Sequence, residues 1–221
     1  MSLLVKICGL TSAAAMDAAL EAGADMVGLV FFPRSPRNVQ IPEAGALAAR
    51  ARGRAEVVTL TVDADDATLG MIVGAVKPDI LQLHGAESPE RVAEIRRRFG
   101  LRVMKAIGIS APGDLAVLSH HASVSDLLLV DAKPPKTPGA LPGGNGLAFD
   151  WRLVAGLDPG VPVMLSGGLT PETVANAVRL TRLQGVDVSS GVESAPGVKD
   201  PGKIRAFVAA ARAAAGEGDR R

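Results

Sequence analysis

Residues 161–180 read VPVMLSGGLTPETVANAVRL and contain, in one run, the unit from which the chain is built. The apolar stretch Val161–Ser166 has the length and composition of a buried strand. Gly167-Gly168 then lets the backbone turn, and Thr170-Pro171 supplies a capping residue and a first helical residue. Residues 171–180 continue with small and charged side chains at helical spacing. The segment therefore predicts a strand, a tight turn and a helix in direct succession.

The same alternation of a short apolar run and a longer amphipathic segment recurs along the whole chain. Other helical segments include Ser12–Ala22, Ser88–Phe99 and one that Pro42-Glu43 opens with a suitable charge for the helix dipole. Near-continuous apolar strands that alternate with such helices are typical of parallel strands covered on both faces. Eight units in 221 residues predict an α/β fold, a single-domain (β/α)8 TIM barrel. The eight expected strands are Leu3–Cys8, Met26–Phe31, Glu56–Val62, Ile80–Leu83, Arg102–Ile107, Asp126–Val130, Val161–Ser166 and Val186–Ser189.

The organisation of the chain leaves one structural alternative, an open doubly wound sheet. Such a sheet normally carries a glycine fingerprint after its first strand, and Cys8-Gly9-Leu10-Thr11 is not that pattern. No composition break divides the sequence, so we expect one domain over residues 1–221. Within it, residues 215–221 are expected to be a frayed tail, because they contain only Ala, Gly and charged residues.

Composition narrows the functional classes. The formal charge is +1 and aromatic residues make up 3% of the chain, which gives no reason to expect a nucleic-acid partner. The longest apolar run, Met26–Phe32, is too short to span a bilayer, and Lys6 interrupts any leader-like start. A single cysteine fits a reducing compartment, so we expect a cytoplasmic protein with no membrane partner. The adjacent pair His120-His121 is expected to be solvated rather than to bind a metal.

Two glycine-rich strand ends predict a phosphate site. Gly167 and Gly168 follow the seventh expected strand, and Ser189, Ser190 and Gly191 follow the eighth. In barrels this is where backbone N–H groups and a helix N-terminus often bind phosphate. The simpler interpretation, that these glycines only make tight turns, is weakened because two such ends follow consecutive strands. Gly144 and Gly146 are expected to add a third wall.

Cys8 stands where the first apolar strand meets a glycine. Free cysteine is often just a small buried hydrophobe, so the position alone leaves both a structural and a chemical role open. Asp131, at the end of the sixth strand, likewise has two interpretations, a turn-making carboxylate or a catalytic group. The long irregular stretch Ala132–Leu147 after it would lie on the face of the barrel where active sites are built.

Taken together, the motifs resemble those of the phosphoribosylanthranilate isomerase family, in order from residue 5 to about residue 207. The most specific combination is Lys-Ile-Cys-Gly at the first strand with an aspartate that ends the sixth. The matching motifs are Lys6-Ile7-Cys8-Gly9, residues 31–37 (FFPRSPR), residues 81–85 (LQLHG), Leu129-Val130-Asp131, residues 143–146 (GGNG), Phe149-Asp150-Trp151, Ser166-Gly167-Gly168-Leu169 and residues 186–193 (VDVSSGVE).

The resemblance implies an Amadori rearrangement in tryptophan biosynthesis, from N-(5-phosphoribosyl)anthranilate to 1-(2-carboxyphenylamino)-1-deoxyribulose 5-phosphate. It implies that Cys8 is the general base and Asp131 the general acid. It also implies that Arg37 holds the anthranilate carboxylate and that His84 lines the same pocket. From the residues alone Arg34 would serve as well as Arg37, since either can clamp a carboxylate. The chemistry needs neither a metal nor a redox cofactor, and the only expected partner is the phosphorylated sugar, bound by a monomer or a homodimer.

Strand parity adds a further expectation. If Cys8 points into the barrel mouth, Lys6 also points inward, as does Asp187 on the neighbouring eighth strand. A lone buried charge is expensive, so we predict that Lys6 and Asp187 pair, within about 6 Å. Lys105 is a second inward lysine, for which an ion pair and a substrate role are equally open.

The sequence departs from the family at two places. The Pro-rich stretch Pro134–Pro138 lengthens the loop after the sixth strand, and Asn145 stands where Thr or Ser is common. Two alternatives to the isomerase remain: another phosphosugar-processing TIM barrel, or a non-catalytic phosphate-binding module. The first would use carboxylates or lysines at other strand ends, and the second would be free to lose the thiol or the acid.

Overall fold

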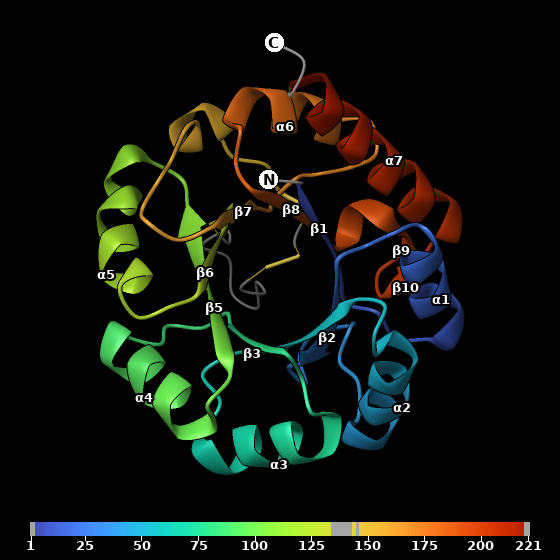
Figure 1. Ribbon diagram of the computed structural model, residues 1–221, viewed down its shortest axis with the longest axis vertical. Helices are drawn as coiled ribbons and strands as arrows, with labels where there is room; N and C mark the ends of the chain where they lie inside the picture. Colours follow the sequence, from blue (N-terminus) through green and yellow to red (C-terminus); the bar gives the residue numbers. More distant parts are fainter. Residues whose placement is uncertain (1–2, 134–142, 145, 219–221) are drawn as a thin grey trace.

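The computed structural model describes residues 3–133, 143–144 and 146–218, and its main feature is a closed barrel of eight parallel strands. Figure 1 looks down this barrel and shows the helices arranged as an outer ring. Each strand pairs with the next, and β8 returns to pair with β1. The strands are β1 (Leu4–Cys8), β2 (Met26–Phe31), β3 (Glu56–Thr61), β4 (Ile80–Leu83), β5 (Arg102–Ile109), β6 (Leu127–Ala132), β7 (Val163–Leu165) and β8 (Gly185–Val188).

The helices follow the strands as the sequence predicts, with short additions near the end of the chain. Between β8 and the last helix lie a 3-10 turn, η3 (Ser190–Val192), and a two-stranded hairpin of β9 (Glu193–Ala195) and β10 (Val198–Lys199). The helices are α1 (Ala13–Glu21), α2 (Ile41–Ala51), α3 (Asp66–Val76), α4 (Pro89–Phe99), α5 (Leu118–Ala122), α6 (Val174–Thr181) and α7 (Pro201–Gly218), with 3-10 turns η1 (Pro112–Val117) and η2 (Trp151–Val154).

The two faces of the strands build two different cores. Side chains that point outward pack with the apolar faces of the helices in a large aliphatic layer. Those that point inward form a smaller cluster, which includes Met26, Val58, Ile80, Met104 and Met164, and fill the barrel. Because the interior is packed, the open space lies above it, at the carboxyl ends of the strands.

Helix α6 begins later than expected. We predicted that it starts at Pro171, but the structure starts it at Val174. Residues 170–173 instead form a turn, in which the amide of Thr170 donates to the hydroxyl of Thr173 at 2.9 Å and the amide of Thr173 donates to the carbonyl of Thr170 at 3.2 Å. These hydrogen bonds use backbone groups of Thr170 and Thr173 that a first helical turn would otherwise pair.

The structure describes part of the tail that we expected to be frayed and part of the long loop after β6. Helix α7 continues to Gly218, so residues 215–218 of the expected tail are helical. Residues 219–221, the proline-rich stretch 134–142 and Asn145 lie outside the described residues. Across the described residues, no helix is both long enough and apolar enough to cross a membrane.

Candidate active site

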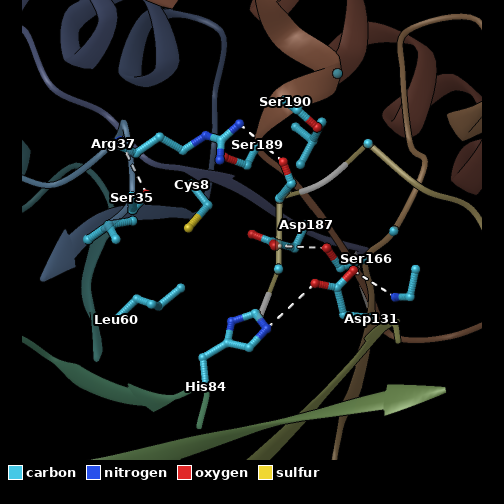
Figure 2. A pocket seen from close by; sticks show the side chains of 18 of the residues that line it. Cys8, Ser35, Arg37, Leu60, His84, Asp131, Ser166, Asp187, Ser189 and Ser190 are labelled. Carbon is cyan, nitrogen blue, oxygen red and sulfur yellow. Dashed lines mark hydrogen bonds and ion pairs between the residues drawn. The ribbon is translucent and has the colours of Figure 1, made fainter. Parts of the chain in front are cut away.

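A pocket lies over the carboxyl ends of the strands, and all of the predicted site residues line it. It holds about 790 Å³ of empty space, counting the part that opens to solvent. Cys8 enters it from the end of β1 and Asp131 from β6, on the far side of the barrel. Figure 2 shows the sulfur of Cys8 and the carboxylate of Asp131 facing the same space from opposite sides. The two groups are therefore placed to act on one bound molecule.

Two glycines make room for the Cys8 side chain and its neighbours. Gly28 lies on β2, opposite Cys8 of β1, and a Cβ on this glycine would lie 2.7 Å from the sulfur of Cys8. Gly9 has φ of +76°, and a Cβ there would lie 2.6 Å from Cδ of Arg37. The glycine after the cysteine thus serves both a left-handed backbone and the close passage of an arginine.

The predicted pair of Lys6 and Asp187 is confirmed. Their heads lie 2.7 Å apart inside the barrel, and the Lys6 side chain is fully buried. Asp187 also accepts a hydrogen bond from the hydroxyl of Ser166 at 3.2 Å. Burial opposes the charged form of Lys6, but Asp187 and Cys8 together outweigh it and raise the pKa of Lys6 above its ordinary value. A charged but mutually neutralised ion pair therefore lies beneath the pocket.

The thiol of Cys8 is held mainly in its neutral form. Burial raises the pKa of Cys8 above its ordinary value, and the positive charge of Lys6 offsets only part of that effect. Lys6 lies two residues earlier on the same strand, so both side chains point to the same side of the sheet. Lys6 is thus the main source of stabilisation for a thiolate, and the carboxylate of Asp187 opposes it by raising the pKa of Cys8.

Asp131 and His84 approach each other across the pocket. His84 Nε2 lies 3.5 Å from Asp131 Oδ2, and its Nδ1 lies 3.2 Å from the side-chain nitrogen Nε2 of Gln82. The other carboxylate oxygen of Asp131 accepts a hydrogen bond from the amide of Ala132 at 2.8 Å. Asp131 is therefore held at one oxygen, while the second faces the imidazole and the open pocket.

Arg37 lines the pocket, but the fork formed by its Nε and Nη2 is already occupied. Nε donates to Glu193 Oε1 at 2.7 Å and Nη2 to Glu193 Oε2 at 2.9 Å. Nη2 also donates to the carbonyl of Gly144 at 3.3 Å. These bonds leave the Nη1 side of the guanidinium as the part that faces a ligand. Arg34, the alternative that the sequence left open, instead lies over the ring of Phe32, 5.8 Å from its centroid.

The glycine-rich strand ends pack against each other at the rim of the pocket. Gly167 and Gly168 have φ of +85° and +71°, in the left-handed region that favours glycine. A Cβ on Gly191 would collide with the carbonyl oxygen of Leu169. The two ends thus form one continuous wall, joined on the pocket side by the predicted residues Ser189, Ser190, Gly144 and Gly146.

Two other predictions concern titratable residues that do not line the pocket. Lys105 donates to Glu87 and to the carbonyl of Gly85, both at 2.8 Å, which matches the ion-pair interpretation. His121 is buried rather than solvated, and its Nδ1 has no hydrogen-bond partner among the described residues. Its place on the inner side of α5 explains the difference, and His120 beside it is exposed as expected.

Sequence reasoning missed several residues around the site. The sequence indicates no role for Glu193 and Lys199, which hold Arg37 and Ser189, or for Ser166 beside Asp187. Glu193 stands at the end of a recognised motif, so its place in the sequence was visible but its contact with Arg37 was not. That contact joins residues 156 positions apart, which no local pattern reports. Among the described residues, no cluster of His, Cys, Asp or Glu side chains could hold a metal ion.

Comparison with known proteins shows that the chain belongs to a single enzyme family. Residues 5–210 match the sequence model of a family described as "N-(5'phosphoribosyl)anthranilate (PRA) isomerase". An enzyme of that name from Nitrobacter hamburgensis is 61% identical over 214 residues, 97% of this chain and 95% of its own. Another from Rhodopseudomonas palustris (strain BisA53) is 63% identical and covers 96% of this chain and 97% of its own.

Solved structures agree with the sequence match. The phosphoribosyl anthranilate isomerase of Thermotoga maritima superposes with a TM-score of 0.86 at 33% identity, covering 96% of this chain and 99% of its own. A second isomerase structure, in complex with reduced 1-(o-carboxyphenylamino)-1-deoxyribulose 5-phosphate, has a TM-score of 0.82 at 32% identity, with the same coverage. Monomers generated from the dimeric Thermotoga maritima enzyme also match, with a TM-score of 0.82 at 33% identity, 96% of this chain and 99% of theirs.

Proposed function

The chain belongs to the N-(5'-phosphoribosyl)anthranilate isomerase family of tryptophan biosynthesis, and we propose that Cys8 and Asp131 are its base and its acid. The observation that carries this proposal is their position on opposite sides of one pocket, beside a wall of glycine loops. Related barrels that act through other strand ends, and binding modules without chemistry, have no need of this pair.

The acid acts first. Protonated Asp131 gives its proton to the ring oxygen of the ribose, the bond from that oxygen to C1 breaks, and the nitrogen lone pair forms a carbon–nitrogen double bond. The product of this step is an open-chain iminium ion, which acidifies the hydrogen on C2. A neutral carboxyl is required, because an ionised one would leave an alkoxide on the departing oxygen.

The base acts second. The thiolate of Cys8 removes the proton from C2, and the electron pair moves to form an enolamine. The C2 hydroxyl then loses its proton to the carboxylate of Asp131, and the thiol of Cys8 protonates C1, which gives the aminoketose. Both groups return to their starting states, so no metal or redox cofactor takes part in the balance.

The remaining site residues bind and orient the substrate. The backbone amides and hydroxyls at Gly167, Gly168, Ser189, Ser190 and Gly191 receive the phosphate, with Gly144 and Gly146 closing the third side. Arg37 receives the anthranilate carboxylate with the Nη1 side of its guanidinium, since Glu193 holds the other side. His84 lies beside Asp131, where it contacts the sugar near the group that opens the ring.

The direct experiment follows the fluorescence of phosphoribosylanthranilate made in situ. Wild-type protein consumes it, and Cys8→Ala and Asp131→Asn each lose about 10²- to 10⁴-fold in kcat, the usual contribution of a positioned acid or base. Normal turnover by either variant would overturn the assignment. A wild-type protein that leaves the substrate untouched would overturn the mechanism as a whole.

Three broader expectations accompany this mechanism. Residues 1–221 act as one domain, which is supported by the closure of β8 onto β1. The partner is the phosphorylated sugar substrate, and the protein works as a monomer or a homodimer. It works in the cytoplasm, where a chain with one unpaired cysteine meets a reducing environment.

A further inference from the structure

The hairpin β9–β10 carries two buried charges that the mechanism has not used. Glu193 and Lys199 are only 8% and 7% exposed, although the hairpin itself lies at the outer edge of the barrel mouth. Burial of a charged side chain is costly unless partners satisfy it. Glu193 is bonded to Arg37 and Lys199 to Ser189, and both of these partners line the active site.

Glu193 holds Arg37 through both carboxylate oxygens. Besides the two bonds from the guanidinium, Oε1 accepts from Lys199 Nζ at 2.7 Å and Oε2 from the amide of Gly197 at 3.2 Å. The planar guanidinium can rotate little when two of its nitrogens are held in this way. Its Nη1 is therefore fixed in direction, on the side of Gly144.

Lys199 holds the first residue of the phosphate wall. Its Nζ donates to the carbonyl of Ser189 at 2.8 Å and lies 3.2 Å from the hydroxyl of the same residue. The same ammonium group donates to Glu193 Oε1. One nitrogen thus connects the phosphate wall to the carboxylate that holds Arg37.

The charges of this group leave a positive surplus. One carboxylate faces the guanidinium of Arg37 and the ammonium of Lys199. Burial opposes its ionisation, but the bonds and charges of these cations keep the pKa of Glu193 below its usual value. A substrate with an aromatic carboxylate and a phosphate meets a site whose formal charge, over these three side chains, is +1, although burial lowers the pKa of Lys199 below its usual value.

We propose that Glu193 and Lys199 are positioning residues, which hold Arg37 and Ser189 in one rigid unit so that the two anionic ends of the substrate are received at a fixed separation. This inference rests on the proposed function, which assigns the carboxylate to Arg37 and the phosphate to the wall at Ser189. The hairpin is then a specificity element, since a shorter or longer phosphosugar would not span both ends.

The test measures binding of an inert ligand, so that it does not depend on Cys8 or Asp131. The probe is reduced 1-(o-carboxyphenylamino)-1-deoxyribulose 5-phosphate, titrated by calorimetry, with kcat and KM measured in parallel. Glu193→Gln is expected to weaken binding about 10- to 100-fold, the usual effect of losing hydrogen bonds to a charged group, and to raise KM more than it lowers kcat. Ser194→Ala, in the same hairpin but outside the charged group, is the matched control and is expected to bind like wild type.

A double-mutant cycle shows whether Glu193 acts through Arg37. Arg37→Met is expected to weaken binding, and Glu193→Gln is expected to add less than about twofold in that background. Full additivity would contradict the inference. If Glu193→Gln alone does not fold, Glu193→Gln with Lys199→Met restores the charge balance, and it is expected to fold but still to bind weakly.

The outcomes separate this inference from the proposed function. Wild-type affinity in a folded Glu193 variant, together with weak binding by Arg37→Met, overturns the inference and leaves the proposed function standing. Wild-type affinity in Arg37→Met overturns the carboxylate assignment, and this inference with it. Weak binding by the control Ser194→Ala would also contradict it, because the hairpin would then act through its general stability.

Discussion

At the scale of the residue, the base role that we propose for Cys8 depends on how its thiol is held. Its pKa is raised by burial, so only a small share is thiolate at neutral pH, and Lys6 limits that effect without removing it. The sulfur must also point at the substrate, and Gly28 provides the space for it. The sequence predicted that Cys8 faces the barrel mouth, but not the dependence on a glycine of the next strand.

We predict that Gly28→Ala lowers kcat by about 10- to 100-fold, because a displacement of around 1 Å at a reacting group costs about that much. A Cβ at this position would lie 2.7 Å from the sulfur and 3.0 Å from the Cα of Cys8, so the thiol has to move. KM is expected to change little, since the anion-binding residues lie elsewhere. Steady-state kinetics with Gly70→Ala as a control, a helix position with open space around it, checks the prediction. Unchanged kcat in Gly28→Ala would contradict it.

The orientation of Arg37 is the residue-scale feature that the sequence could not predict. The family motif distinguishes it from Arg34, but the motif does not report that Glu193 occupies two of its nitrogens. Such a contact depends on the closure of the whole barrel, which brings the loop after β2 next to the hairpin after β8. A local sequence pattern carries no information on which loops a closed barrel brings together.

At the scale of the element, the strands were predictable because they are buried on both faces. Runs of Val, Ile and Leu bounded by Gly and charged residues leave few alternatives, and the start and end of β2 and β4 agree with the sequence prediction. The hairpin β9–β10 was not predicted. Its strands are three and two residues long and contain Glu, Ser and Lys, so they show neither an apolar run nor a clear alternation.

The packing of the strand-end loops supports a prediction about Gly191. Gly191→Ala is expected to separate the loops after β7 and β8, because a Cβ would collide with the backbone carbonyl of Leu169. We expect a loss of about 1–3 kcal/mol in the free energy of unfolding, the usual cost of overpacking, together with a raised KM. The matched control is Gly74→Ala in α3, where nothing lies within 4 Å of a new Cβ, and it should stabilise the protein by up to about 1 kcal/mol.

Urea unfolding and steady-state kinetics measure both effects on the same preparations. The outcome that contradicts this account is a Gly191→Ala protein with wild-type stability and wild-type KM. Equal loss of stability in both variants would also count against it, because the effect would then belong to alanine in general.

At the scale of the whole molecule, the barrel closes through β1 and β8, and a buried ion pair lies at that seam. Lys6 is opposite Asp187 in the register of the two strands, and their heads are 2.7 Å apart. Strand parity predicted this pair from the sequence, because a closed barrel makes the first and last strands neighbours. The fold and the chemistry therefore share residues, since the same lysine also influences the thiol.

We predict that Asp187→Asn destabilises the protein by about 3–5 kcal/mol, because it leaves the fully buried ammonium of Lys6 without its counter-charge. The double variant Lys6→Met with Asp187→Asn should recover much of this loss. Asp150→Asn removes an exposed pair with Arg152 and should cost far less, because solvent screens that pair. Urea unfolding of the three variants tests the claim, and equal costs for the buried and the exposed pair would contradict it.

The central claim is that the thiolate of Cys8 removes a proton from the substrate. This chain has one cysteine and no tyrosine, so its ultraviolet absorbance at alkaline pH reports the ionisation of Cys8 without interference from another thiol or a phenol. The decisive measurement compares that titration with the pH dependence of kcat/KM, which reports essential groups of the free enzyme. Because the mechanism also requires a proton on residue 131, the profile is measured in Asp131→Asn, whose residual activity has no carboxyl at that position to ionise. Because burial raises the pKa of Cys8, we predict that the residual kcat/KM of this variant rises with increasing pH, along the thiolate curve and with a midpoint above the usual value for a thiol. A residual kcat/KM that stays constant over the pH interval in which the thiolate forms would contradict the account.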